Sequence, residues 1–344
     1  MKPINKITQC FTIALLFVAS FAAAQDTRFS QPLNNQLALN PAMMALTSDF
    51  RISLSYRNQW ASIEKGYVNY AGSLLYPLFL KTGGSAKDTT RKAEGKSRID
   101  FGLNLNDDKA GGFNLLNATL SVGYSLQLSP EHSLSAALNL GYLHRSFNVL
   151  QQSWDEQYSQ GSFDVNAPTG ETPSLKKGSI DVGLGLMYHY VQDKGKWQAF
   201  AGLGAFHVNQ PNLTVLLEDG SLGKLATRFN IQAGVKMIGN KIDFTPVMLY
   251  NIQGRYKQFT GGMLLAYKFG EKGKLVVGSW YKEKQSVVLQ AGYEHKLFFF
   301  TYSYDFGISK LDRTTKGLMT HEVTLAFKLV DVAKKKGIKN NSFF

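Results

Sequence analysis

Side chains that commonly carry catalysis are sparse and scattered in this chain. None of its six histidines forms the two-histidine helix motif of a zinc protease, and His321-Glu322 has no second histidine nearby. No Gly-x-Ser-x-Gly nucleophile elbow occurs. Gly183-Leu184-Gly185 and Gly202-Leu203-Gly204 lack the third glycine of a dinucleotide fingerprint. We therefore expect a non-enzymatic protein with no cofactor and no metal site, in which these glycines make room for close packing.

One segment with a potential binding role precedes the first predicted strand. Residues 26–46 contain Phe29-Ser30-Gln31 and Asn40-Pro41-Ala42, and their mixed polarity fits neither a strand nor a disordered linker. The segment could fold into a barrel lumen as a hatch or remain a loosely held periplasmic tail. We predict the hatch, formed around Asn40, Pro41 and Ala42.

Two further segments could bind partners. The connection 148–178 carries Trp154 and Tyr158, and exposed aromatic side chains bury large areas at modest entropic cost. It could instead simply cap the barrel. The tail carries Lys334-Lys335-Lys336, which either dock an acidic periplasmic partner or remain solvated. We predict partner contacts at Trp154 and Tyr158 and a periplasmic docking role for the three lysines.

The N-terminus is typical of an export signal. Lys2 and Lys6 precede a short apolar run from Phe11 to Phe21, and Ala22-Ala23-Ala24 offers a small-residue cleavage site. The apolar run is too short to span a bilayer as a helix. We predict a signal peptide over 1–24, an N-terminal periplasmic or lumenal segment over 25–47, an outer-membrane barrel over 48–330 and a basic periplasmic tail over 331–344.

Composition narrows the class of protein further. The single cysteine, Cys10, lies inside the predicted signal peptide, so no disulfide is expected in the mature chain. The net charge of +13 would fit nucleic-acid binding, but the export signal and the lack of a nucleic-acid motif argue against that partner. No later apolar run approaches the length of a transmembrane helix. A soluble β-protein or a transmembrane barrel remains.

Period-two alternation favours the barrel. Between Leu116 and Leu128, leucine, valine, alanine and tyrosine alternate with asparagine, threonine, serine, glycine and glutamine. Successive side chains of a strand point to opposite faces, so this strand has one apolar and one polar side. Strands of about ten residues cross a bilayer when tilted, whereas soluble strands average about five or six. In lipid the sheet must close on itself, because unpaired backbone groups at an open sheet edge would be too costly there.

The sequence predicts an all-β, antiparallel transmembrane barrel of about fourteen strands, with twelve or sixteen as alternatives. The predicted strands cover 50–58, 67–77, 99–106, 114–128, 133–147, 179–191, 197–207, 226–238, 242–253, 257–269, 274–282, 285–295, 297–306 and 318–329. An even number places both barrel termini in the periplasm, with short turns there and longer loops outside. The long connection 81–98 and the short one at Glu283-Lys284 fit this layout poorly.

Two groups of motifs near the ends of the chain resemble the PorP/SprF family. The first group is Asp26 to Gln31, Asn40-Pro41-Ala42 and Ser53 to Trp60; the second is Tyr302 to Leu311 and His321 to Leu325. The resemblance implies an outer-membrane barrel of the type IX secretion and gliding apparatus, without catalytic residues. Implied partners are the translocon, secreted adhesin-like proteins with a C-terminal sorting domain, and periplasmic ring subunits. The charged insertion 81–98 and the polar stretch 32–37 depart from the family pattern.

A competing interpretation uses the same residues. Asn-Pro-Ala near the N-terminus also resembles the hatch of FadL-type channels for hydrophobic small molecules. A channel needs a continuous apolar path, whereas the predicted inward faces are polar or small. We therefore predict an accessory that binds and positions a secreted protein or the translocon. Partner contacts are expected at Arg57, Asn58 and Trp60, at the outer end of the first strand.

Overall fold

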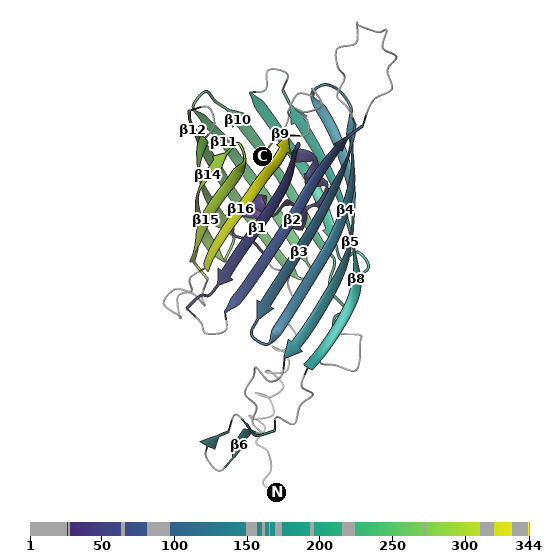
Figure 1. The fold of residues 1–344 in the computed structure, drawn as a ribbon, viewed down its shortest axis with the longest axis vertical. Helices are drawn as coiled ribbons and strands as arrows, with labels where there is room; N and C mark the ends of the chain where they lie inside the picture. The colour runs from purple at the N-terminus through teal and green to yellow at the C-terminus, as the bar shows by residue number, and fades with distance from the viewer. Residues whose placement is uncertain are drawn as a thin grey trace.

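A computed structural model describes most of the chain outside its N-terminal region, several connections and the C-terminal tail (Figure 1). The described residues are 26, 28–62, 66–80, 97–148, 157–159, 162–164, 166–168, 174–192, 196–214, 224–270, 273–309, 320–331 and 343. The helices among them are too short or too polar to cross a bilayer.

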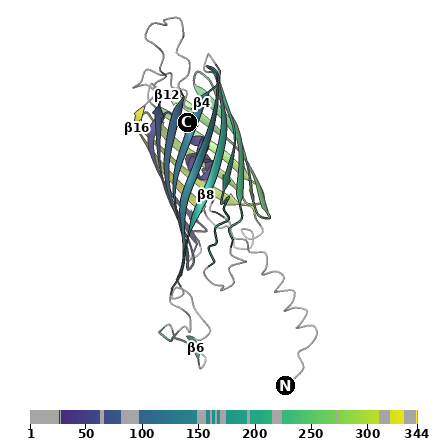
Figure 2. The same ribbon diagram turned by 90° about the vertical axis from the view of Figure 1, so that its right-hand side faces the viewer.

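Fourteen antiparallel strands form one closed barrel (Figures 1 and 2). They are β1 Asp49–Gln59, β2 Tyr67–Phe79, β3 Arg98–Ala110, β4 Phe113–Gln127, β5 His132–Asn148, β8 Ser174–Val191, β9 Trp197–Phe206, β10 Arg228–Ile238, β11 Ile242–Gln253, β12 Tyr256–Phe269, β13 Gly273–Lys282, β14 Ser286–His295, β15 Phe298–Gly307 and β16 Thr320–Asp331. Each of the fourteen predicted strands overlaps one of these. The predicted fold and strand number are confirmed.

The barrel closes where its first strand pairs with its last. Asp49 lies opposite Asp331, and Gln59 lies opposite Thr320, with one register shift after Phe50. The start of β1 and the end of β16 therefore lie at the same end. Following the layout of bacterial outer-membrane barrels, we call this the periplasmic end and the opposite one the outer end.

The connections fit this orientation with the expected exceptions. At the periplasmic end, strands β4 and β5 and strands β14 and β15 are joined by tight turns, but residues 80–97 make a long connection between β2 and β3. At the outer end, β5 and β8 are joined through a small hairpin of β6 (Tyr158–Ser159) and β7 (Ser162–Phe163). Short outer turns also occur, as at Gly111-Gly112. Connection length alone is thus an imperfect guide to orientation.

Alternating burial confirms the predicted faces of the strands. In β4, Thr119 and Ser121 are buried, whereas Leu120 is 53% exposed and Val122 is 42% exposed. The exposed apolar side chains point toward the lipid, where they need no covering protein. The polar side chains point into the lumen.

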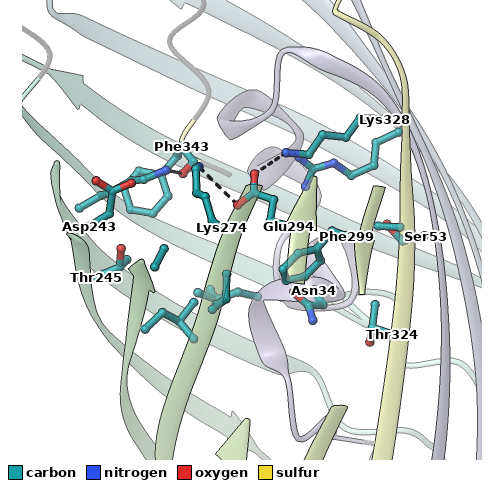
Figure 3. Close-up of a pocket in the computed structure, with 17 residues that line it drawn as sticks. Asn34, Ser53, Asp243, Thr245, Lys274, Glu294, Phe299, Thr324, Lys328 and Phe343 are labelled. Atoms are coloured by element: carbon teal, nitrogen blue, oxygen red, sulfur yellow. Dashed lines mark hydrogen bonds and ion pairs between the residues drawn. The ribbon is translucent and has the colours of Figure 1, made fainter. Parts of the chain in front are cut away.

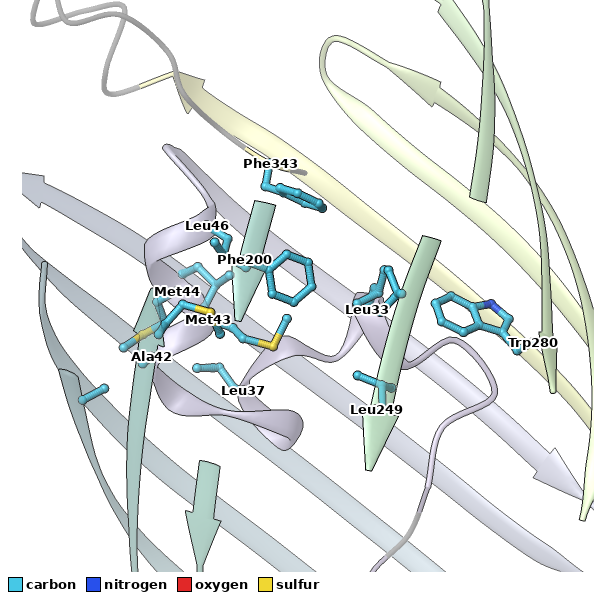
Figure 4. Close-up of a cluster of buried hydrophobic side chains, with 14 of the residues drawn as sticks. Leu33, Leu37, Ala42, Met43, Met44, Leu46, Phe200, Leu249, Trp280 and Phe343 are labelled. Carbon is cyan, nitrogen blue, oxygen red and sulfur yellow. The ribbon is translucent and has the colours of Figure 1, made fainter. Parts of the chain in front are cut away.

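The chain before β1 runs through the lumen (Figure 4). It contains three short helices, η1 (Pro32–Asn34), α2 (Gln36–Leu39) and η2 (Pro41–Leu46). Asp26 contacts the outer ends of strands, whereas residue 49 begins β1 at the periplasmic end. We call residues 28–48 the lumenal segment; it leads from the outer end to the periplasmic end.

An apolar cluster joins the lumenal segment to the barrel wall (Figure 4). Its segment side includes Met43 and Leu46, both 0% exposed. Its wall side consists of inward-facing residues from several strands: Leu75, Ala137, Met187, Phe200, Val247, Leu249, Trp280 and Val288. The inward faces are therefore less uniformly polar than the sequence predicts, because apolar positions occur where the segment packs.

Candidate functional site

Asn40, Pro41 and Ala42 form a helix start inside the barrel. The Asn40 side chain accepts a hydrogen bond from the Ala42 backbone N–H at 2.9 Å and thereby caps η2. Proline fits the first helical position because its missing N–H would have no helical partner there. The Asn40 amide also donates to the Leu186 carbonyl on β8 at 2.9 Å. This local motif therefore fixes both the helix and its attachment to the wall; its role as a hatch stays a prediction.

Two wall glycines allow this attachment. A Cβ on Gly185 would lie 2.2 Å from Asn40 Oδ1, and one on Gly204 would lie 2.6 Å from the Leu39 carbonyl oxygen. Neither distance is possible for a real side chain. Gly185 and Gly204 thus show the close packing that the sequence predicts for the two Gly-Leu-Gly motifs.

Glu322 on β16 is the main anchor in the outer half of the lumen. Its carboxylate accepts from the backbone N–H groups of Ser30 at 2.5 Å and Gln31 at 3.2 Å. The Arg57 Nε lies 3.6 Å from Glu322 Oε2, and both side chains are almost completely buried. Arg57 also donates to the Ser30 hydroxyl at 3.3 Å. A buried carboxylate is tolerated only with such partners.

The two groups of motifs that carry the family resemblance meet around this anchor. The Gln31 amide donates to the Ser303 hydroxyl on β15 at 3.1 Å and to the Glu322 carbonyl at 2.9 Å. The Thr301 hydroxyl donates to the side-chain oxygen of Gln31. Residues separated by most of the chain therefore form one hydrogen-bonded site. The two groups of motifs supply the two sides of this contact between the lumenal segment and the barrel wall.

A second buried ion pair lies in the same half of the lumen. Lys282 Nζ is 3.1 Å from Asp305 Oδ2, and both side chains are at most 5% exposed. Asp305 also accepts from the Ser286 hydroxyl at 3.4 Å. Asp305 belongs to the closing motif of the resemblance, whereas Lys282 was not predicted to have a role.

Asp26 holds the beginning of the described chain at the outer end. Its carboxylate lies 2.7 Å from His207 Nε2 and 2.9 Å from Arg228 Nη1, and His207 Nδ1 lies 2.9 Å from Asp181 Oδ1. Burial alone would lower the pKa of His207, but Asp26 and Asp181 raise it to about 9. Burial alone would raise the pKa of Asp26, but Arg228 and His207 hold it well below its ordinary value. The contact is therefore an ion pair at neutral pH.

Two contacts hold the other end of the lumenal segment. Arg98 on β3 donates to the Met44 carbonyl at 3.0 Å and pairs with Asp100 at 3.0 Å. From the opposite terminus of the chain, the Phe343 N–H donates to the Leu46 carbonyl at 2.8 Å. Phe343 is 1% exposed and belongs to the apolar cluster. The segment is thus held at its outer end, at its middle and at its periplasmic end.

The residues predicted to contact a partner are spread over different environments. Arg57 faces the lumen and is buried, whereas Asn58 is half-buried beside the outer end of β16. The Trp60 ring lies 4.9 Å from the Tyr67 ring in the turn after β1. Tyr158 is 60% exposed in the small outer hairpin. Partner binding by all four stays a prediction.

The remaining predicted residues lie outside the described chain. Trp154 belongs to the undescribed part of the outer connection, and Lys334, Lys335 and Lys336 belong to the undescribed part of the C-terminal tail. Their predicted roles are neither supported nor opposed by the structure.

Apart from Arg57, the charged residues that hold the lumenal segment were not among the predicted site residues. Glu322 follows His321 in the sequence, but alternation sends the two side chains to opposite faces: His321 pairs with the Tyr302 hydroxyl at 2.6 Å on the exposed side. In the described part of the chain, no three histidine, cysteine or acidic side chains gather as a metal site requires. The sequence did contain one signal for these residues. A charged residue at an inward position of a membrane strand needs a partner inside the barrel, and such positions can be found from the alternation.

Residues 21–327 match the family described as type IX secretion system membrane protein PorP/SprF. The match covers nearly the whole chain and includes both groups of motifs. The chain belongs to the PorP/SprF family. Together with the closed barrel, this membership places it in the outer membrane, in association with type IX secretion.

No curated protein matches this PorP/SprF chain. Among solved structures, it is similar to the CymD monoaromatic hydrocarbon channel, with 11% identity over 86% of this chain and 91% of that one and a TM-score of 0.47. It is also similar to a Pseudomonas aeruginosa FadL homologue, with 9% identity over 85% and 93% and a TM-score of 0.48. The P. putida toluene transporter TodX has 11% identity over 84% and 92%, with a TM-score of 0.47.

Proposed function

We propose that this PorP/SprF protein is a non-enzymatic accessory of type IX secretion. Its lumen is occluded by its own N-terminal segment, and its outer loops bind and position a large, adhesin-like secreted protein or the translocon. The observation that supports this proposal most is the buried hydrogen bonding between the segment and inward-facing polar groups of the wall, with Glu322 accepting from Ser30 and Gln31. A barrel filled in this way offers its loops, rather than a pore, for function.

The outer hairpin is the described surface that best suits a protein partner. Tyr158 is 60% exposed and Phe163 is 47% exposed, and the two residues pair across the hairpin. Exposed aromatic side chains are favourable anchors in protein interfaces. Arg57 is a weaker candidate than the sequence predicts, because its guanidinium is turned inward to Glu322 and Ser30.

At the periplasmic end, the C-terminal lysines provide a second docking surface. Lys334, Lys335 and Lys336 would attract an acidic partner such as a periplasmic ring subunit. The secreted client would carry a C-terminal sorting domain and be held outside by the loops. The barrel would thus connect the periplasmic apparatus to the cell surface without conducting anything itself.

Purification of the tagged protein from its own outer membrane in mild detergent, followed by mass spectrometry, tests this proposal. Near-stoichiometric recovery of translocon subunits or of a very large secreted protein would support the accessory role. A clean barrel that carries only a small hydrophobic ligand would favour the alternative, a FadL-like channel.

Replacement of residues 153–172 by a flexible linker tests the role of the outer connection. We expect a folded barrel that no longer displays the secreted partner on the cell surface. The double variant Tyr158→Ala/Phe163→Ala should show a partial loss, while the lipid-facing control Leu140→Ala should display the partner normally. Normal display in the linker variant would contradict the assignment.

A further inference from the structure

A cavity lies between the lumenal segment and the barrel wall, in the periplasmic half of the lumen (Figure 3). Its volume is about 100 Å³, and its walls are contributed by η1, by every strand from β10 to β16, by β1 and by Phe343. No role of the barrel described above uses this space. Its lining nevertheless combines charged and apolar side chains in a way that indicates a ligand.

The two acidic side chains in the lining are already paired. Glu294 lies between two lysines, with Lys328 Nζ at 2.7 Å and Lys274 Nζ at 3.4 Å, as Figure 3 shows. Asp243 lies 2.6 Å from the Nζ of Lys268. The direct ion pairs of both carboxylates are thus made with lysines other than Lys236.

Lys236 on β10 is a cation of the lining for which the described residues provide no direct ion pair. Within the described chain, no carboxylate lies within 4.0 Å of its Nζ. Its ammonium donates instead to the neutral backbone carbonyl of Phe343 at 2.5 Å and lies 5.6 Å from the centre of the Phe343 ring. Lys236 is half-buried, and a cation held partly out of water is costly without a counter-charge in direct contact. An anion in the cavity would supply that charge.

The remaining walls set the shape of the ligand. They include Leu33, Leu264, Val276, Phe299 and Phe343, so the ligand must carry an apolar body beside its anionic group. A cavity of about 150 Å³ holds one benzene molecule. The smaller cavity here fits a short aliphatic group or the tip of a larger side chain, but not a long acyl chain.

Phe343 shows how such a ligand would sit. Its backbone N–H donates to the Leu46 carbonyl at 2.8 Å, its carbonyl oxygen accepts from Lys236, and its ring packs edge-on against Phe200 at 4.8 Å. The chain thus places its own carbonyl oxygen where the oxygen of a carboxylate would bind Lys236. A charged oxygen would bind there more strongly than this neutral one.

We propose that this cavity binds a compact organic carboxylate, whose carboxylate displaces the Phe343 carbonyl from Lys236 and whose apolar body enters the space beside Leu264 and Val276. A free short-chain acid and the carboxyl-terminal residue of a polypeptide share this chemistry. Entry is from the periplasmic end. This site goes beyond the proposed secretion role and does not depend on it.

Binding to the purified full-length barrel in detergent tests the site. Butyrate represents a free acid and N-acetylvaline a chain end; the neutral amides butyramide and N-acetylvaline amide are their matched controls without a carboxylate. Isothermal titration should show saturable binding of at least one acid and of neither control. Butyrate binding identifies free acids as ligands, and binding of N-acetylvaline alone identifies chain ends. Equal binding of acids and controls, or of none, would overturn the proposal.

Three variants and one control variant locate the binding. Lys236→Met should weaken acid binding by about tenfold, the size expected for loss of one charge-assisted hydrogen bond. Lys236→Arg should keep most of it, and the exposed control Lys109→Met should leave it unchanged. Removal of residues 343–344 should tighten binding, because the competing carbonyl is gone. Unchanged affinity in Lys236→Met, or in the truncated chain if Lys236→Met fails to fold, would contradict the site.

Discussion

Buried charges inside the barrel are concentrated where the lumenal segment meets the wall. Glu322 combines one arginine with two backbone N–H donors, and this combination compensates its loss of hydration. Asp26 combines Arg228 with His207 in the same way at the outer end. Removal of one partner therefore costs more than the pair contributes, because the remaining charge stays buried.

A double-mutant cycle on Arg57 and Glu322 measures this effect. Arg57→Met should lower the free energy of unfolding by about 3–5 kcal/mol, because it leaves a buried carboxylate without its cation. Arg57→Met/Glu322→Gln should cost clearly less than the sum of the two single variants. Urea unfolding of the refolded barrel gives these values.

The exposed pair Lys109–Asp107 provides the matched control for this cycle. The Lys109 side chain is 52% exposed and the Asp107 side chain 28% exposed, so the coupling between them should be about 0–1 kcal/mol. Additive effects for Arg57 and Glu322 would show that Glu322 does not depend on Arg57.

The Asp26–His207 contact predicts a pH dependence. The folded-state pKa of His207 is raised to about 9, so its contribution is complete below its ordinary value of 6.5 and is lost as the pH rises through about 9. The lowered pKa of Asp26 makes its contribution complete above 3.8 and lost in acid. We expect the melting temperature to fall between about pH 7 and pH 10, with a smaller fall in His207→Gln. Identical profiles would contradict the ion pair.

At the scale of elements, the strands were predictable, and so was a segment before β1 that enters the lumen, but the helices of that segment were not. Alternation of apolar and polar residues fixes a membrane strand locally, because lipid on one side demands apolar groups along its whole length. The helices α2 and η2 have no such local signal. They form because Asn40 caps η2 and because leucine and methionine side chains meet partners from distant strands.

The packing of η2 against β8 gives a prediction at this scale. Gly185→Ala would place a methyl group against Asn40, Pro41 and Ala42, so it should lower the free energy of unfolding by about 1–3 kcal/mol. In the control Gly72→Ala, the new Cβ would meet only Leu54 at 3.5 Å, an ordinary contact. Thermal or urea unfolding of both variants measures the difference. Equal stability would mean that η2 does not press on β8.

For the whole molecule, the sequence predicted the architecture but not the contacts across the lumen. The N-terminal motif and the closing motif lie at opposite ends of the sequence, and only the closed barrel brings Gln31 to Ser303 and Glu322. Lys282, His207 and Arg228 had no sequence signal beyond an inward position or a place beside a strand end. Their roles depend on which strand lies opposite, and a single sequence does not specify that.

At the scale of the whole molecule, the property to test is whether the lumenal segment stays attached to the barrel wall. Contacts of Asp26, Ser30 and Asn40 attach the chain before β1 to β10, β16 and β8, and the Leu46 carbonyl accepts from Phe343. An accessory that works through its loops needs this attachment to be permanent. A channel would need it to open.

Ion conductance of the purified barrel in planar lipid bilayers tests this central claim most directly. We predict no steady conductance for the natural chain, and steady open-channel currents for a variant that lacks residues 28–46 but still folds. Persistent currents through the natural chain would contradict the account, because they would show that the lumenal segment leaves a continuous path through the membrane.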